Sequence, residues 1–154
     1  MTDQYYLDSS ALVKRYVVET GTDWIGHLCA VQAGNTLYTA RVTGAEIAAA
    51  LFRKAREGAL AAPDAQAAIT RFKADFRRRY QIVEITDELI DTAMALVERH
   101  ALRGYDAVQL AAALELQGTR ASLSLSPIHF VCADDRLNAA AEGEGLVTEN
   151  PNQH

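Results

Sequence analysis

The sequence predicts an α/β fold in which helices cover a parallel sheet. Short apolar runs rich in β-branched and aromatic residues alternate with helical patterns along the chain, and this alternation is typical of strand–helix–strand units. Two of these runs end close to acidic residues, with Asp8 directly after residues 5–7 and Asp134 separated from residues 129–132 by one residue. Because the carboxyl ends of parallel strands share one edge, where open α/β sheets bind ligands, we expect a functional site there.

Length and composition favour one globular domain. The chain has 154 residues, of which 49% are hydrophobic and 23% charged, and we expect a single domain at 1–149 followed by a polar tail at 150–154. The apolar runs are shorter than the ~20 residues of a membrane span, and the first residues lack the basic start of a signal peptide, so we expect a cytoplasmic protein with no membrane contact. Cys29 and Cys132 are too few for a disulfide framework and are expected to be buried thiols.

The net charge of −5 excludes a protein that holds nucleic acid by its overall charge. A polyanionic substrate would need a local basic patch or bound metal ions. The helix expected at 63–80 has a basic face, which we interpret as a solvated surface in preference to an RNA track.

In the first half of the chain, the spacing of apolar residues predicts two strands and four helices. Either Ser9 or Ser10 can cap the first helix. The elements are expected, in order, as a strand at 5–7, helices around 12–17 and at 22–33, a strand at 35–39, and helices at 43–58 and 63–80.

The second half repeats the pattern. Thr86 is placed to cap one helix, and the nearly all-apolar stretch 105–114 predicts a buried one. We expect a strand at 81–85, helices at 87–100 and 102–117, a loop at 118–127, a strand at 129–132, a helix at 136–142, a strand at 146–148 and a frayed tail from 150.

Four carboxylates stand at element boundaries beside apolar runs: Asp8, Glu46, Asp106 and Asp134. If the strands are parallel, all four can converge on one edge of the sheet. Two carboxylates ~4 Å apart repel by roughly 4 kcal/mol at an effective dielectric near 20, so convergence favours a cation. An all-oxygen ligand set favours Mg²⁺ or Mn²⁺ over Zn²⁺, and such a site is suited to phosphodiester hydrolysis.

Three of these acids also have structural explanations. Glu46 stands three residues after Thr43, which is the spacing of a capping box. Asp106 in a first helical turn meets the helix dipole favourably, and Asp134 or Asp135 could cap the last helix. Asp8 is the hardest to explain in this way, because two serines beside it already offer caps.

Four segments resemble the motifs of PIN-domain ribonucleases, especially the VapC-type toxins of bacterial toxin–antitoxin pairs. They are 6–14 (YLDSSALVK), Glu46 ahead of 50–54 (ALFRK), 105–113 (YDAVQLAAA) and 130–137 (FVCADDRL). Each motif is short, but the four occur in the family's order and cover nearly the whole chain.

The resemblance implies a three-layer α/β/α sandwich around a parallel sheet and metal-dependent endonucleolytic cleavage of RNA. It makes Asp8, Glu46, Asp106 and Asp134 the acidic quartet that binds Mg²⁺ or Mn²⁺ and positions the attacking water. Ser10 matches a hydroxyl residue that supports the first aspartate. The family also implies a homodimer and a cognate antitoxin whose C-terminal segment lies across the active-site groove.

The chain departs from the family pattern at two positions. Cys132 stands where many relatives have Ser or Thr, and Asp135 follows Asp134 where a basic or polar residue is common. The spacing to Arg136 favours Asp134 as the fourth ligand, with Asp135 beside it.

Two other functions are alternatives to the ribonuclease. One is a non-catalytic interaction module that keeps the PIN fold and its partner-binding groove. The other is a phosphatase with a nucleophilic aspartate, but that mechanism needs a second carboxylate two residues after the first, where this chain has Ser10.

Overall fold

The computed structural model describes residues 2–154. Its centre is a five-stranded sheet in the order β3-β2-β1-β4-β5, and every pairing is parallel. This confirms the predicted α/β class. The strands are β1 (Gln4–Leu7), β2 (Thr36–Ala40), β3 (Gln81–Val83), β4 (His129–Val131) and β5 (Val147–Glu149).

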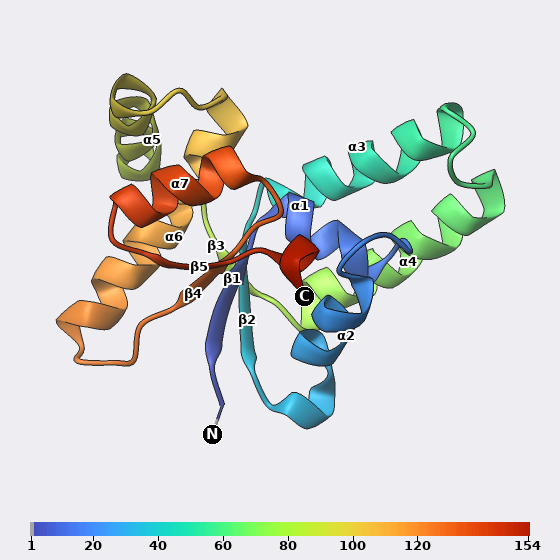
Figure 1. The fold of residues 1–154 in the computed structure, drawn as a ribbon, viewed down its shortest axis with the longest axis horizontal. Helices are drawn as coiled ribbons and strands as arrows, with labels where there is room; N and C mark the ends of the chain where they lie inside the picture. Colours follow the sequence, from blue (N-terminus) through green and yellow to red (C-terminus); the bar gives the residue numbers. More distant parts are fainter. Residues whose placement is uncertain (1) are drawn as a thin grey trace.

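Helices cover both faces of the sheet, as Figure 1 shows, so the predicted three-layer α/β/α sandwich is confirmed. The α-helices are α1 (Ser9–Leu12), α2 (Thr22–Cys29), α3 (Thr43–Arg56), α4 (Ala62–Arg78), α5 (Asp87–Arg99), α6 (Gly104–Ser122) and α7 (Asp135–Gly143). Three short 3₁₀ turns are η1 (Val13–Arg15), η2 (Val31–Ala33) and η3 (Pro151–Gln153). No helix formed by residues 2–154 has the length and hydropathy needed to cross a membrane.

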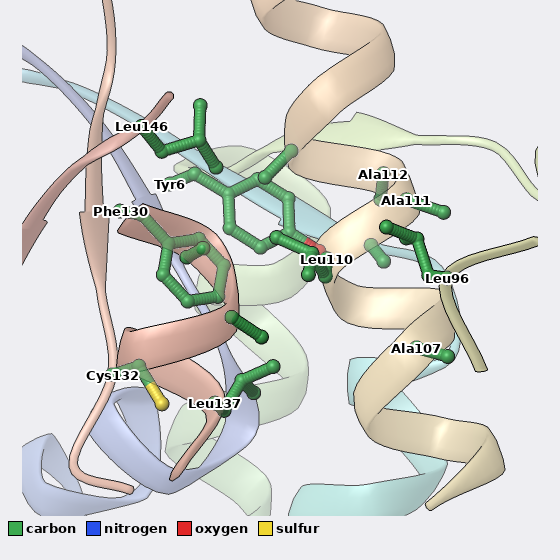
Figure 2. Packing of buried hydrophobic residues seen from close by; sticks show 14 of the residues in the cluster. Tyr6, Leu96, Ala107, Leu110, Ala111, Ala112, Phe130, Cys132, Leu137 and Leu146 are labelled. Atoms are coloured by element: carbon green, nitrogen blue, oxygen red, sulfur yellow. The ribbon is translucent and has the colours of Figure 1, made fainter. Parts of the chain in front are cut away.

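Alternation along β1 directs neighbouring side chains into two separate cores. Tyr6 packs with the layer of α5, α6 and α7, whereas Leu7 packs with α1 to α4. In the first core, the rings of Tyr6 and Phe130 stack with centroids 5.7 Å apart (Figure 2). The buried alanines 111–113 of α6 lie in the same core (Figure 2), and their small side chains allow the helix to lie close to the sheet.

Several element boundaries differ from the prediction. The first helix is a single turn that continues as a 3₁₀ turn, and α6 runs on to Ser122 where a loop was expected from residue 118. The extension contains Arg120, whose Nη1 donates to the hydroxyl of Tyr38 on β2 at 3.4 Å. Such a contact arises only after folding and therefore overrides the local turn signal.

The C-terminal residues pack against the domain. Pro151 is buried, and the ring of His154 stacks on Trp24 with centroids 4.1 Å apart. Gly21, at φ +88°, fits closely below Pro151, where a Cβ would collide with the proline carbonyl. The expectation of a frayed tail is wrong, because buried contacts to α2 order a segment whose composition is polar. The division into a domain at 1–149 and a tail stays a prediction, and its first residue, Met1, lies outside the described residues.

Candidate active site

Asp8 lies at the carboxyl end of the central strand, almost fully buried at 3% exposure. Its Oδ1 accepts hydrogen bonds from the main-chain nitrogen of Ala11 at 3.1 Å and from the hydroxyl of Ser10 at 2.7 Å. Asp8 is therefore the N-cap of α1, and the expectation that Ser9 or Ser10 provides the cap is wrong. The cap uses one carboxylate oxygen.

Burial raises the pKa of Asp8 from its ordinary value of 3.8 to about 6. The hydrogen bonds from Ser10 and Ala11 oppose this rise, and the charge of Glu46 adds to it. A carboxylate that burial and a neighbouring charge both disfavour gains from a cation placed beside it.

Glu46 lies in the first turn of α3 and does not form the capping box that its spacing suggested. The N-cap position belongs to Val42, which makes no side-chain cap. The two carboxylate oxygens of Glu46 instead accept from Gln109 Nε2 at 2.7 Å and from the Ser9 hydroxyl at 3.0 Å. Burial raises the pKa of Glu46, these two hydrogen bonds lower it, and the charge of Asp106 raises it further.

Asp106 and Asp134 lie on the other side of the same edge. Asp134 is the N-cap of α7, and its Oδ1 accepts from the main-chain nitrogens of Arg136 at 2.8 Å and Leu137 at 3.3 Å. Asp134 therefore caps the last helix, as its structural explanation predicted. Both hydrogen bonds end on Oδ1. Burial raises the pKa of Asp106, and the charge of Asp134 is the second cause of the rise.

The four acids form a row in which each is close enough to the next to repel it. Glu46 raises the pKa of Asp8, Asp106 raises that of Glu46, and Asp134 raises that of Asp106. A groove of about 640 Å³ contains Glu46 and Asp106, and a second hollow of about 530 Å³ continues from Asp106 to Asp134. The fold therefore gathers the acids, which lie far apart in the sequence, along one edge.

The donor chemistry of this row fits a hard divalent cation, since every donor is a carboxylate oxygen. Within residues 2–154, however, no three His, Cys, Asp or Glu side chains form a compact metal-binding group. The Cys132 thiol lies beside the row, but burial raises its pKa, so it stays neutral and is a poor ligand. The acids thus offer the oxygen ligands that Mg²⁺ and Mn²⁺ prefer, but they are arranged in a row and not in a compact cluster.

The two departures from the family motif have clear positions. Cys132 is buried, and its sulfur accepts from the main-chain nitrogen of Asp134 at 3.3 Å and lies 3.6 Å from the Ser10 hydroxyl. Asp135 accepts from Asn150 Nδ2 at 2.8 Å, which ties it to the segment after β5. Asp134 is the aspartate whose charge raises the pKa of Asp106.

Cations line the groove despite the negative net charge. Arg53, Lys54 and Arg103 contribute to its walls together with the buried Lys14. Lys14 and Lys54 both bind Glu19, at 3.1 and 3.4 Å. The groove therefore combines a row of acids with a basic flank, an arrangement suited to a metal and a phosphate chain. The exposed basic face of α4 is separate from these lining residues.

Sequence reasoning missed Gln109, the buried partner of Glu46. Its side chain is 1% exposed, and it stands one helical turn after Asp106. A single amide inside the otherwise apolar stretch 107–114 was the available signal, because a buried amide needs hydrogen-bond partners.

The family model of the PIN domain matches residues 5–143. The chain belongs to the PIN domain family. A comparison with curated protein sequences finds no match.

This PIN domain is similar in fold to several solved structures. PAE2754 from Pyrobaculum aerophilum has a TM-score of 0.61 and 20% identity over 95% of this chain and 83% of that one. VapC20 from Mycobacterium tuberculosis, described as a sarcin–ricin loop cleaving toxin, has a TM-score of 0.62 and 17% identity, covering 93% and 96%. VapBC2 from Rickettsia felis, bound to a promoter DNA fragment, has a TM-score of 0.62 and 12% identity, covering 96% and 98%.

The buried acid predicts a pH-dependent stability in metal-free protein. Because the folded state holds a proton on Asp8 up to a pKa of about 6 and the unfolded state releases it near 4, stability is lost as the pH rises through this window. A shift of about two units corresponds to up to about 3 kcal/mol. The Asp8→Asn variant lacks this loss, so its free energy of unfolding should rise relative to that of the wild type between pH 4 and about pH 6 and then level off. Urea unfolding with chelator at several pH values measures the difference, and a constant difference would contradict the prediction.

Proposed function

We propose that this PIN domain is a metal-dependent endoribonuclease of the VapC type, acting in the cytoplasm as the toxin of a toxin–antitoxin pair. The observation that carries the proposal is the gathering of four carboxylates at the carboxyl edge of the sheet, where Asp8 follows β1 and the other three line a groove and the hollow that continues from it. Membership of the PIN family supports the interpretation of this row as a nuclease active site.

Asp8, Glu46, Asp106 and Asp134 would hold Mg²⁺ or Mn²⁺. The cation supplies activation of a water and neutralisation of phosphoryl charge. Ser10 donates to Asp8 and accepts from the main-chain nitrogen of Ala133 at 3.0 Å, so it fixes the first aspartate relative to the end of β4. It acts by orienting Asp8. Asp135 is assigned a neighbouring, supporting position.

The cations of the groove give the RNA backbone a place to lie. Arg53 and Arg103 are exposed at its walls and can contact phosphates on either side of the reacting one. Such contacts position the strand without reading its sequence, and they supply the local attraction that the net charge of the chain does not provide.

An exposed apolar strip is the surface that we assign to protein partners, a second copy of the chain and a cognate antitoxin. It lies between α5 and α6, and Met94 and Tyr105 are 56% and 62% exposed there. Tyr105 also lines the groove beside Asp106, so a partner on this strip would reach the acidic row.

The first test is the incubation of purified protein with a pool of structured RNAs in Mg²⁺, in Mn²⁺ and in excess chelator. We expect discrete internal cuts with either metal and none with chelator. Sequencing of the new ends maps the preferred site. Cleavage that persists in chelator would overturn the metal assignment.

The alternative, a non-catalytic interaction module, is favoured by one observation, the absence of a compact metal-binding group within residues 2–154. It predicts no cuts with either metal and no Mn²⁺ binding by calorimetry, together with tight binding of a protein partner. RNA cleavage and Mn²⁺ calorimetry on the same protein therefore separate the two functions.

A further inference from the structure

A buried polar network connects the central strand to Glu46 through one side chain. The Tyr6 hydroxyl donates to Gln109 Oε1 at 2.6 Å, and Gln109 Nε2 donates to Thr43 Oγ1 at 2.9 Å and to Glu46 Oε1 at 2.7 Å. The carboxamide thus has partners on both of its polar ends, inside a core that excludes water.

The neighbouring threonines fix which way the carboxamide faces. The Thr39 hydroxyl donates to the Leu7 carbonyl at 2.8 Å, and the hydroxyl oxygens of Thr39 and Thr43 lie 2.8 Å apart. A carbonyl can only accept, so the single hydrogen of Thr39 is used there, and Thr43 supplies the hydrogen between the two hydroxyls. The Thr43 oxygen is then left to accept from the NH₂ group of Gln109.

This orientation makes Gln109 a donor to Glu46. A donor favours the ionised carboxylate and holds it in one orientation. A lysine or arginine could do the same, but its positive charge would oppose a cation at the acidic row. Gln109 adds no charge, so the full negative charge of Glu46 remains available.

We propose that Gln109 is a positioning residue that holds the Glu46 carboxylate, through a neutral hydrogen bond, in the orientation that binds a divalent cation. The inference rests on the proposed function and extends it to a residue outside the acidic quartet. Because α6 also carries Asp106, one helix both provides an acid and orients another on α3.

The test compares Mn²⁺ affinity, by calorimetry without RNA, in Gln109→Met and in the matched control Gln66→Met. Methionine has a similar length but donates no hydrogen bond to Glu46. Removal of such outer partners typically weakens metal binding by 10- to 100-fold, so we expect a rise of about tenfold or more in Kd and a parallel loss of cleavage. Gln66→Met makes the same chemical change at an exposed position of α4 and should change the Kd by less than about twofold.

A double-mutant cycle distinguishes positioning from a general structural role. If Gln109 acts through Glu46, Gln109→Met should weaken Mn²⁺ binding no further in a Glu46→Gln background. Should Gln109→Met fail to fold, Gln109→Asn keeps a carboxamide but is too short to reach Glu46, and the same loss is expected.

The outcomes separate this inference from the proposed function. A wild type that binds Mn²⁺ and cleaves RNA, with an unchanged Kd in Gln109→Met or an equal loss in both backgrounds, would overturn the positioning role alone. A wild type that binds no Mn²⁺ would overturn both.

Discussion

Replacement of Asp8 by asparagine is expected to reduce RNA cleavage by about 100- to 1,000-fold, the usual loss when one group that stabilises transition-state charge is removed. Asp8 lies at the end of the central strand and is the most buried of the four acids. Because burial disfavours its negative charge, Asp8 gains the most from a bound cation. Mn²⁺ binding should weaken in parallel.

The fold should survive this substitution. Asparagine is as good an N-cap as aspartate, and its oxygen can still accept from the main-chain nitrogen of Ala11. Removal of a buried charge also relieves the repulsion by Glu46. Single-turnover cleavage, Mn²⁺ calorimetry and urea unfolding on the same preparation measure the three effects.

Asp3→Asn is the matched control for Asp8→Asn. Asp3 is exposed and precedes β1 at the opposite edge of the sheet, so the same chemical change there should leave cleavage unaltered. Equal cleavage by wild type and Asp8→Asn would sink the assignment of the active site.

The second large effect is expected at Asp134, compared with the adjacent Asp135. Asp134→Asn should lower cleavage by about 100-fold, because the acidic row loses the charge next to Asp106. Asparagine can still cap α7. A loss of cleavage would therefore result from the missing charge and not from a less stable helix. Asp135→Asn should stay within about twofold, because Asp135 is bound to Asn150.

Cleavage rates of these two variants with Mn²⁺ and with Mg²⁺ decide between the aspartates. The reverse order of effects would make Asp135 the fourth acid and would require the start of α7 to rotate in the active protein. Thermal unfolding of both variants controls for loss of the cap.

The sequence predicted most of the fold because the signals for strands and helices are local. The helix at 87–100 was anticipated within one residue, and Thr86 caps it as expected, accepting from the main-chain nitrogen of Leu89 at 3.1 Å. The positions of four acids at element boundaries were also visible, since an apolar run followed by a carboxylate marks the edge of a sheet. The extent of α6 and the packing of the C-terminal residues were predicted wrongly, because Arg120 and Pro151 find their partners only in the folded chain.

The candidate site likewise has features that the sequence predicted and features that it did not. By itself, the sequence determined which carboxylates can meet, because the order and direction of parallel strands bring their ends to one edge. Only the tertiary structure decided what each carboxylate binds there. Asp8 caps the helix that follows it. Glu46 forms no capping box with Thr43 and instead accepts from Ser9 and Gln109, which are 37 and 63 residues away. The reason is that hydrogen bonds form between groups that are close in space, whereas spacing along the chain predicts only bonds between residues that are close in sequence.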